Sequence, residues 1–165
     1  MLQGELGGRV DVYTIGHSNV EVAQLLDALR NNGIALVVDT RSSPYSRFVP
    51  WANRESLAAE LQRAGIAYRF AGAKLGGKPA DPSLHTPDGA PDYDKIAQSA
   101  AYLQGIEEVM AAASQERLAL LCSEADPLEC HRERLIGRTL RARGCAVKHI
   151  LADGSLLNQL QGTLF

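Results

Sequence analysis

The chain passes from an apolar strand into the start of a helix in the segment Leu118-Ala-Leu-Leu-Cys-Ser-Glu-Ala-Asp-Pro-Leu-Glu-Cys-His-Arg132. Asp126 is a typical helix cap, Pro127 suits the first helical position, and Glu129 completes a capping box. Thiol, carboxylate, imidazole and guanidinium groups lie around this joint. Ligands of open α/β sheets bind where strands end and helices begin. The segment therefore predicts an α/β fold and the place of a site within it.

The same alternation of strand and helix recurs along the rest of the chain. Amphipathic helices are expected to end at Gly33, Gly65 and Gly144, and a strand-like run follows each glycine. Glycine readily adopts the left-handed conformation that ends a helix. Strands that alternate with helices at this spacing indicate right-handed βαβ units and a parallel sheet. We expect strands near residues 10–15, 34–39, 66–70, 118–122 and 146–151, with four crossover helices between them.

Polar residues mark the expected start of each helix. Ser18 and Glu21 fit a capping box before the first helix, Asn53 can cap the second, and Asp94 can cap a longer third. Asp126 caps the fourth. The predicted fold is a single α/β domain over residues 1–165, with a mostly parallel five-stranded sheet and helices on both faces in a Rossmann-like three-layer arrangement.

Length and composition limit the possible classes of protein. A chain of 165 residues with 45% hydrophobic and 22% charged residues is typical of one globular domain. No apolar run approaches the roughly 20 residues that cross a bilayer, and the N-terminus lacks a basic start and an apolar core. We therefore expect a cytoplasmic protein without a membrane partner. The net charge of −2 gives no overall attraction to nucleic acid or anionic membranes.

Two segments do not fit the alternation of strands and helices. Residues 71–93 form a long connection rich in glycine, proline and aspartate, and long connections are often functional, so we predict a possible lid. The tail Gln161-Gly-Thr-Leu-Phe165 resembles the Q-x-[SD]-L-F peptides that bind the bacterial sliding clamp. A terminal phenylalanine that packs onto its own domain is the alternative.

Several charged residues follow the carboxyl ends of the expected strands and should converge on one edge of the sheet. Arg41 and Arg47 flank the hydroxyl-rich loop that begins at Ser42, and Arg132 lies at a helix start, where exposed N–H groups favour an anion. We predict a site for a phosphate or carboxylate. The alternative is a structural network that pairs Arg41 with Asp39 and Arg132 with Glu124.

The three cysteines form no C-x-x-C pair, which disfavours a disulfide framework and a structural zinc site. Cys130 is near the start of the fourth helix, where the helix dipole and an arginine would lower the pKa of a thiol, so it is a candidate nucleophile. It also lies several residues after Asp126 and lacks the C-x5-R spacing, which favours a packed structural thiol; metal ligation is a further alternative. Cys122 and Cys145 are interpreted as core residues.

Two histidines and a glutamate are candidates for proton transfer. His17 follows the first strand and His131 follows Cys130, so either could act as an acid or base while Glu124 orients one of them. His17, Asp39, Glu124 and His131 could together bind a divalent metal, but no H-x-x-x-H or D-x-D spacing supports this. We therefore expect no metal and no cofactor.

The fourth helix is basic along its length. It contains five arginines and two glutamates, a net charge of +3, at Arg132, Arg134, Arg138, Arg141, Arg143, Glu129 and Glu133. Such a face could follow a phosphate backbone, or it could be a solvated exterior with cations near a helix C-terminus.

Four blocks of the sequence resemble the DUF488 family, which is named for its lack of an assigned function. The blocks are Thr14-Ile-Gly-His-Ser-Asn19, Val38-Asp-Thr-Arg-Ser-Ser-Pro-Tyr-Ser-Arg47, Gly65-Ile-Ala-Tyr68 with Leu75-Gly-Gly77, and Leu121-Cys-Ser-Glu-Ala-Asp-Pro-Leu-Glu-Cys-His-Arg132. Thr40 stands where the family more often has valine, and Ala52 replaces a frequent aromatic residue, with Trp51 one step earlier. The resemblance implies an α/β fold and one shared site that includes Pro44 together with His17, Asp39, Arg41, Arg47, Glu124, Cys130, His131 and Arg132.

These observations predict an enzyme, or a ligand-binding domain, that acts on a phosphate-bearing nucleotide or nucleic-acid substrate at the cluster of arginine, histidine, glutamate and cysteine. The sequence does not decide between enzyme and binding protein. One alternative is a non-enzymatic module that binds nucleic acid or serves DNA metabolism through the basic helix. Another is a redox or nucleophilic thiol protein that uses Cys130.

Overall fold

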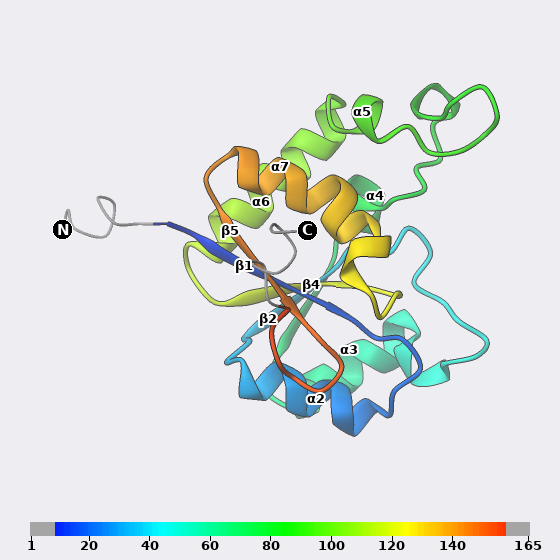
Figure 1. Cartoon of the computed structure of the whole chain (residues 1–165). Coiled ribbons are helices and arrows are strands. Elements are labelled where there is room, and N and C mark those ends of the chain that lie inside the picture. Colours follow the sequence, from blue (N-terminus) through cyan, green and yellow to red (C-terminus); the bar gives the residue numbers. More distant parts are fainter. Residues whose placement is uncertain (1–8, 158–165) are drawn as a thin grey trace.

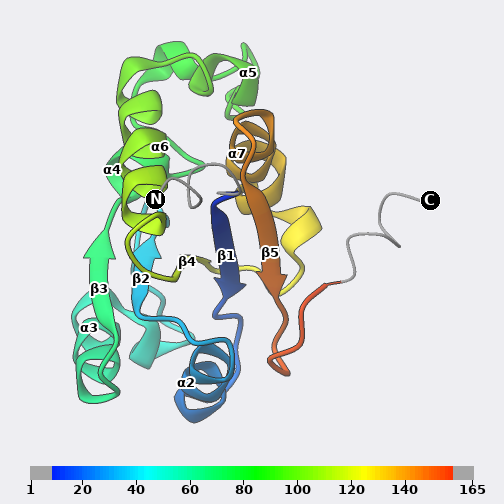
Figure 2. The same cartoon turned by 90° about the vertical axis from the view of Figure 1, so that its left-hand side faces the viewer.

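The computed structural model describes residues 9–157 and contains an all-parallel five-stranded sheet (Figure 1). The strands are β1 (Asp11–Gly16), β2 (Leu36–Asp39), β3 (Ala67–Phe70), β4 (Leu118–Cys122) and β5 (Ala146–Ile150). Figure 2 shows their order, β3-β2-β4-β1-β5. The predicted α/β class is therefore confirmed, and every predicted strand is present within two residues of its expected bounds.

Helices cover both faces of the sheet (Figure 2). The helices α2 (Val22–Asn31) and α3 (Arg54–Arg63) lie on one face. The other face is covered by α4 (Gly72–Leu75), α6 (Ala100–Ala113), the π-helical turn η4 (Arg132–Gly137) and α7 (Arg138–Ala142). Short elements complete the chain: η1 (Pro50–Ala52), η2 (Pro82–Leu84), α5 (Tyr93–Ile96) and η3 (Pro127–Glu129).

The central strand β4 explains the layered core. All five of its residues are buried, because it has a strand on each side and helices above and below. Leu118 and Leu120 pack into the core beneath α6 and α7, whereas Ala119 and Leu121 pack into the core beneath α2 and α3. Each fully buried leucine contributes about 2 kcal/mol of hydrophobic free energy. The end of β4 is thereby fixed between the ends of β1 and β2.

The side-chain caps predicted for the first two helices are not formed. Helix α2 starts at Val22, and its preceding residue Glu21 makes no side-chain capping bond; Ser18 lies earlier, in a turn with a φ of 45°. Asn53 precedes α3 but its Oδ1 accepts a hydrogen bond from the Ser46 N–H at 2.6 Å. The capping box at Ser18 is therefore wrong. Asn53 is the residue before α3, as predicted, but its side chain binds the loop after β2 instead of the helix N–H groups.

The third predicted helix is broken into two. Asp92, not Asp94, accepts the N–H of Lys95 and caps the short α5. The chain then begins again at Ser99, whose hydroxyl accepts the N–H of Tyr102 and caps α6. A second capping residue inside the apolar pattern thus produces a bend that periodicity alone did not indicate.

The fourth predicted helix also begins in two steps, and this difference changes the interpretation of Cys130. Asp126 caps only the 3-10 turn η3, where its carboxylate accepts the N–H of Leu128 at 2.9 Å. Cys130 then has an extended backbone, and the continuous helix starts after it, at η4. Cys130 is therefore at the N-terminus of the helix, where the peptide N–H groups point toward it.

The connection 71–93 contains α4, η2 and a bridge between His85 and Pro91, and its predicted role as a lid stays a prediction. The tail peptide 161–165 lies outside the described residues.

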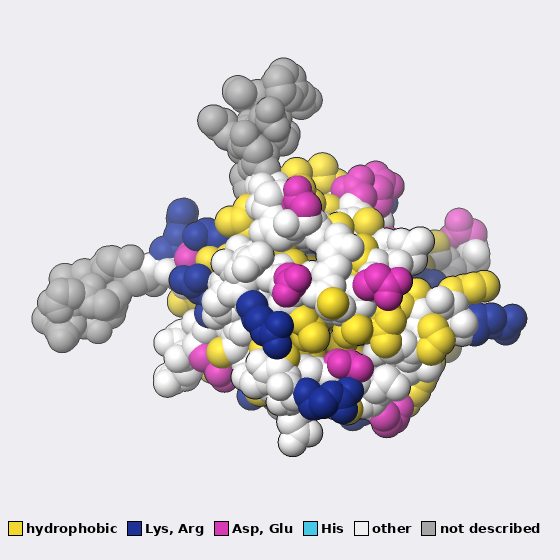
Figure 3. All heavy atoms as spheres, turned by 90° about the horizontal axis from the view of Figure 1, so that it is seen from below, with side chains coloured by type: hydrophobic (Ala, Val, Ile, Leu, Met, Phe, Trp, Pro, Cys, Tyr) yellow, Lys and Arg dark blue, Asp and Glu magenta, His cyan; other side chains and the backbone are white. Residues whose placement is uncertain are grey.

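Within residues 9–157, no helix is long and apolar enough to cross a bilayer. On the face that α2 and α3 form, acidic and basic side chains are scattered around a hydrophobic area (Figure 3).

Candidate functional site

A cleft of about 500 Å³ lies at the carboxyl end of the sheet, toward which β1 points in Figure 1. Its walls come from residues 41–43 after β2, from parts of the connection 71–93, and from the last residue of β4 and the segment after it. Five of the predicted site residues line it: Arg41, Ser42, Glu124, Cys130 and His131. The convergence predicted from the parallel strands is therefore present for this half of the set.

The surroundings of Cys130 in the cleft strongly lower the pKa of its thiol. Its sulfur lies 2.9 Å from the sulfur of Cys122 and accepts the backbone N–H of Arg132 at 3.4 Å. These hydrogen bonds, first of all that with Cys122, and the nearby His131 lower the pKa of Cys130 well below that of an ordinary thiol, although burial opposes the shift. Cys130 is only 3% exposed, yet it forms part of the cleft wall. The arrangement favours a thiolate at neutral pH.

His131 lies between the thiol and the loop after β2. Its Nε2 is 3.2 Å from the Thr40 carbonyl and its Nδ1 is 3.7 Å from the Cys130 sulfur. One ring nitrogen thus faces the Thr40 carbonyl and the other faces the Cys130 sulfur. Gly77 makes room for the ring, because a Cβ there would lie 2.9 Å from His131 Cγ.

Glu124 faces the thiol pair from the loop after β4. Partial desolvation and the charge of Cys130 raise the pKa of Glu124, so this carboxyl keeps its proton to a higher pH than usual. Ligand atoms of Cys122, Glu124 and Cys130 all lie within 4.8 Å of one another. Two thiolates and a carboxylate are ligands that Zn²⁺ accepts, although protein zinc sites usually have four ligands. The expectation of no metal stays a prediction.

Arg41 is held by a buried carboxylate. Its Nε and Nη2 donate to the two oxygens of Asp39, each at 2.8 Å, and Tyr68 donates its hydroxyl to the same carboxylate at 2.6 Å. Asp39 is fully buried and does not line the cleft. The Nη1 of Arg41 bonds to no group within residues 9–157, which leaves one N–H edge for a ligand. The pair predicted as the structural alternative is therefore present, and it orients the arginine.

Arg132 has a structural position beneath the cleft. It is fully buried, and its guanidinium donates to the Thr14 hydroxyl and to the carbonyls of Glu124 and Ala125. Its Nε has no partner among the described residues. Arg132 does not line the cleft, so its predicted contact with a bound anion is not supported, and it holds the backbone of Glu124 rather than the carboxylate named in the structural alternative. It fixes the loop that presents Glu124.

A glycine allows this loop to approach the sheet. A Cβ on Gly16 would lie 1.7 Å from the Glu124 carbonyl oxygen, so no larger residue fits without a backbone shift. The loop is also joined to β1 by main-chain bonds, from the His17 N–H to the Cys122 carbonyl and from the Ser18 N–H to that of Ser123. The Gly-His-Ser turn of the first block is thus part of the support of the site.

His17 lies beside the cleft rather than in its wall. Its Nδ1 is 2.7 Å from the Ser18 carbonyl, which places the ring proton there and leaves Nε2 buried without a partner among the described residues. Burial lowers the pKa of His17, and the charge of Arg41 adds to the effect, so the ring is neutral at pH 7. Its predicted role as a general base stays a prediction.

The remaining predicted residues belong to the loop after β2. The Ser42 hydroxyl accepts the N–H of Lys78 and joins this loop to the connection 71–93. The carbonyl of buried Pro44 accepts the N–H of Arg54, which places Pro44 in the support of α3. Arg47 is exposed and does not line the cleft. The three arginines predicted to hold one anion are therefore not brought together.

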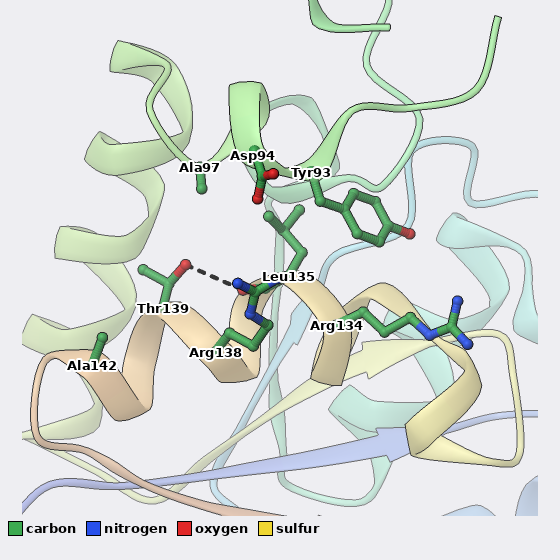
Figure 4. A pocket seen from close by; sticks show the side chains of 8 residues that line it. All are labelled: Tyr93, Asp94, Ala97, Arg134, Leu135, Arg138, Thr139 and Ala142. Atoms are coloured by element: carbon green, nitrogen blue, oxygen red, sulfur yellow. Dashed lines mark hydrogen bonds between the residues drawn. The ribbon is translucent and has the colours of Figure 1, made fainter. Parts of the chain in front are cut away.

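A smaller cavity of about 220 Å³ lies between α5 and the continuous helix of η4 and α7, and Figure 4 shows its lining. It contains no thiol and no histidine. The basic helix beside it is largely engaged: Arg134 contacts Glu129, Arg141 pairs with Glu133, and Arg143 pairs with Glu107. Arg132 is buried. This helix therefore offers a weaker phosphate-binding face than its sequence indicated.

Sequence reasoning missed two important members of the cleft. Cys122 was interpreted as a core residue, although the argument that placed Glu124 at the sheet edge also applies to a thiol at the last position of a strand. Lys78 comes from the long connection, and nothing in its local sequence indicates that the connection folds back onto Ser42.

Together the fold and the cleft define an α/β protein with a thiol pair at the carboxyl edge of a parallel sheet. The chain belongs to the DUF488 family, described as a domain of unknown function, whose model matches residues 21–139. This range includes the whole cleft but not β1, β5 or His17. Neither a curated protein nor a solved structure matches the chain.

Proposed function

We propose that this protein is an enzyme in which Cys130 attacks an anionic, phosphate-bearing or carboxylate-bearing substrate bound in the cleft. One observation supports this most directly: Cys130 is at a helix N-terminus with a lowered pKa and forms part of the wall of a cleft of about 500 Å³. Of the hypotheses drawn from the sequence, the nucleophilic thiol now fits the geometry best. A cytoplasmic location, also proposed, would keep the thiols reduced.

Other residues that line the cleft suit the anionic part of a substrate. Arg41 presents its Nη1 edge, Lys78 adds an exposed ammonium group, and Ser42 and Ser43 supply polar groups. A planar guanidinium whose other edge is fixed by Asp39 loses little freedom when it binds a phosphate or carboxylate. The phosphate-bearing ligand predicted from the sequence is thus retained, with Arg41 and Lys78 in place of three arginines.

Glu124 and Cys130 have complementary roles in this proposal, as acid and nucleophile. The Cys130 sulfur forms a bond to the electrophilic atom of the substrate, the bond from that atom to its leaving oxygen breaks, and Glu124 gives its proton to that oxygen. Water then attacks the covalent intermediate, Glu124 takes up the proton of that water, and the sulfur leaves as a thiolate. The raised pKa of Glu124 and the lowered pKa of Cys130 are the pairing that an acid and a nucleophile need.

The nucleophile is tested with p-nitrophenyl acetate, a generic electrophile for activated thiols. We expect a burst of p-nitrophenol and an acetyl group on Cys130, located by peptide mass spectrometry. Cys130→Ser should lose the burst, and Cys145→Ser, a thiol on the opposite edge of the sheet, should keep it. A burst that survives in Cys130→Ser would refute the assignment.

The anion wall is tested with two alkylating agents of similar shape. Iodoacetate is an anion and iodoacetamide is neutral, so the ratio of their rates at Cys130 reports the positive charge near the thiol. We expect Lys78→Gln to lower that ratio about threefold, as befits one partly screened surface charge. Lys95→Gln, at a charge outside the cleft, is the matched control. An unchanged ratio in Lys78→Gln would remove Lys78 from the anion site.

A further inference from the structure

The two cysteines of the cleft are close enough to react with each other. Their sulfurs lie 2.9 Å apart, and a disulfide bond is about 2.05 Å long, so closure needs a movement of less than about 1 Å. Cys122 ends β4, and Cys130 follows the short turn η3. Residues 123–126 between them are exposed, but Ser18 and Arg132 hold the carbonyls of residues 123–125, so the movement must come from the two cysteine side chains.

The two thiols differ in pKa, which determines which of them reacts first. The environment lowers the pKa of Cys130, whereas burial and the hydrogen bond with Cys130 raise the pKa of Cys122. Cys130 is therefore the thiolate and Cys122 the protonated partner. Reaction with a peroxide begins at a thiolate, and the oxidised sulfur is then attacked by a neighbouring thiol.

We propose that Cys130 and Cys122 form a reversible disulfide when the protein meets a peroxide, with Cys130 oxidised first and Cys122 as the resolving thiol. The proposal deepens the proposed function, since it uses the same reactive thiol, but it requires no group-transfer step. Formation of the bond blocks Cys130 and makes the cleft sensitive to oxidation.

The reaction balances in two steps. The Cys130 thiolate attacks one oxygen of hydrogen peroxide, the O–O bond breaks, and Cys130 becomes a sulfenic acid with release of hydroxide. The Cys122 sulfur then attacks the Cys130 sulfur, the S–O bond breaks, and the Cys122 proton leaves with the hydroxyl as water. Two thiols are oxidised and one peroxide is reduced. A dithiol such as dithiothreitol restores both thiols by exchange.

Rapid resolution also protects Cys130. A sulfenic acid without a thiol partner is oxidised further to sulfinic and sulfonic acids, which thiol reductants do not reverse. Cys122 lies in contact with the sulfur on which the sulfenic acid forms. Cys145 lies just before β5, at the end of the sheet where the strands begin, and does not line this cleft.

The experiment uses reduced, chelator-treated full-length protein and an equimolar amount of hydrogen peroxide, with alkylation of the remaining thiols and peptide mass spectrometry. We expect a Cys122–Cys130 disulfide that dithiothreitol reverses, and the same result in Cys145→Ser. In Cys122→Ser, dimedone should trap a sulfenic acid on Cys130, and excess peroxide should carry it irreversibly to the sulfinic acid. Circular dichroism reports whether the variant is folded.

Cys122→Ala, which keeps the site apolar, replaces the serine variant if that variant is unfolded, and the wild-type disulfide map does not depend on either. Irreversible oxidation of Cys130 in the wild-type protein, or a disulfide that involves Cys145, would overturn the inference. A Cys122–Cys130 disulfide without any acetyl burst would support the inference and refute the proposed function. An acetyl burst without the disulfide would do the reverse.

Discussion

The carboxyl edge of the sheet, where its parallel strands end, and the amino edge, where they begin, each hold a thiol. The two thiols are similarly buried but have different neighbours. Cys130, at the carboxyl edge, is 3% exposed, and Cys145, at the amino edge, is 5% exposed. The Cys130 sulfur receives an N–H from the start of a helix and lies beside Cys122 and His131, and the pKa of this thiol is lowered. Cys145 has no such donors among the described residues, and burial raises the pKa of its thiol. Burial alone therefore does not determine the reactivity of a thiol in this fold.

The arginines of the two edges differ in the same way. Arg132, at the carboxyl edge, is fully buried and donates to the Thr14 hydroxyl and to two carbonyls of the loop that bears Glu124. Arg143, at the amino edge, makes an ion pair with Glu107 at the surface. The carboxyl edge thus depends on buried polar contacts for its shape, and the amino edge does not. Four substitutions at the carboxyl edge, two of them with a matched control at the amino edge, test this difference.

The largest effect is expected from Arg132→Met. The variant leaves the carbonyls of Glu124 and Ala125 without their donor, and the free energy of unfolding should fall by about 3–4 kcal/mol. Arg143→Met removes only a surface pair and should cost less than about 1 kcal/mol. Chemical denaturation of both variants checks this. Equal losses would contradict the structural role of Arg132.

Gly16→Ala should have the next largest effect. Its Cβ would meet the Glu124 carbonyl oxygen, so the loop must move, at a cost of about 2–3 kcal/mol, and the reactivity of Cys130 should fall with it. Gly144→Ala, at the amino edge, has open space around the new Cβ. Its only cost is the strain of a side chain at a φ of +90°, about 1 kcal/mol of stability. Thermal unfolding and Cys130 alkylation test both. Unchanged alkylation in Gly16→Ala would show that the loop position does not matter to the thiol.

Glu133 connects the stability of this region to pH. Burial would raise the pKa of Glu133, but hydrogen bonds from His149 and Arg141 outweigh it and lower the pKa to about 2. Because the folded pKa lies below the ordinary value of 4.5, the stabilisation is complete above pH 4.5 and is lost as the pH falls toward 2. Glu133→Gln should remove a contribution on the order of 2 kcal/mol at pH 7 and flatten the stability profile in that window. Urea titrations from pH 7 to pH 3 measure it, and an equally steep profile in the variant would exclude Glu133 as the source.

The smallest effect is expected from His131→Asn. The variant removes the ring near the Cys130 sulfur but leaves the Arg132 N–H and the Cys122 thiol in place. The pKa of Cys130 should rise by about one unit, which corresponds to about 1.4 kcal/mol. The ultraviolet absorbance of the thiolate is followed against pH, with Cys130→Ser as the blank, and its midpoint gives the pKa of Cys130. A pKa that does not move would assign the thiolate to the helix N-terminus and Cys122 alone.

Much of the fold could be predicted because its causes are local. The runs before Gly33, Gly65 and Gly144 and the strands after them follow from periodicity and helix ends, and a parallel sheet follows from their alternation. Helix starts were harder to predict, since a capping residue competes with other partners. Asn53 binds the loop at Ser46, and Asp126 caps only a single 3-10 turn.

Part of the site could be predicted because strand direction follows from the alternation of strands and helices. The direction of the strands brought Arg41, Glu124, Cys130 and His131 to one cleft. It could not say that Arg132 turns inward to Thr14, because that depends on packing between segments far apart in the sequence. Lys78 was missed on the same ground. Cys122 was missed although strand direction also places the last residue of β4 at this cleft, and Arg47 was included because its sequence neighbours are in the loop.

We infer that the carboxyl edge makes Cys130 a thiolate, whereas the amino edge leaves Cys145 a protonated thiol. This difference is tested by the rate of iodoacetamide alkylation of each cysteine from pH 4 to pH 9, with each site resolved by mass spectrometry and with Cys122→Ala as a parallel sample. We predict that Cys130 reacts at nearly the same rate from pH 6 to pH 9, whereas Cys145 becomes about tenfold slower with each unit of falling pH. Parallel profiles for Cys130 and Cys145, both falling below pH 9, would contradict the account.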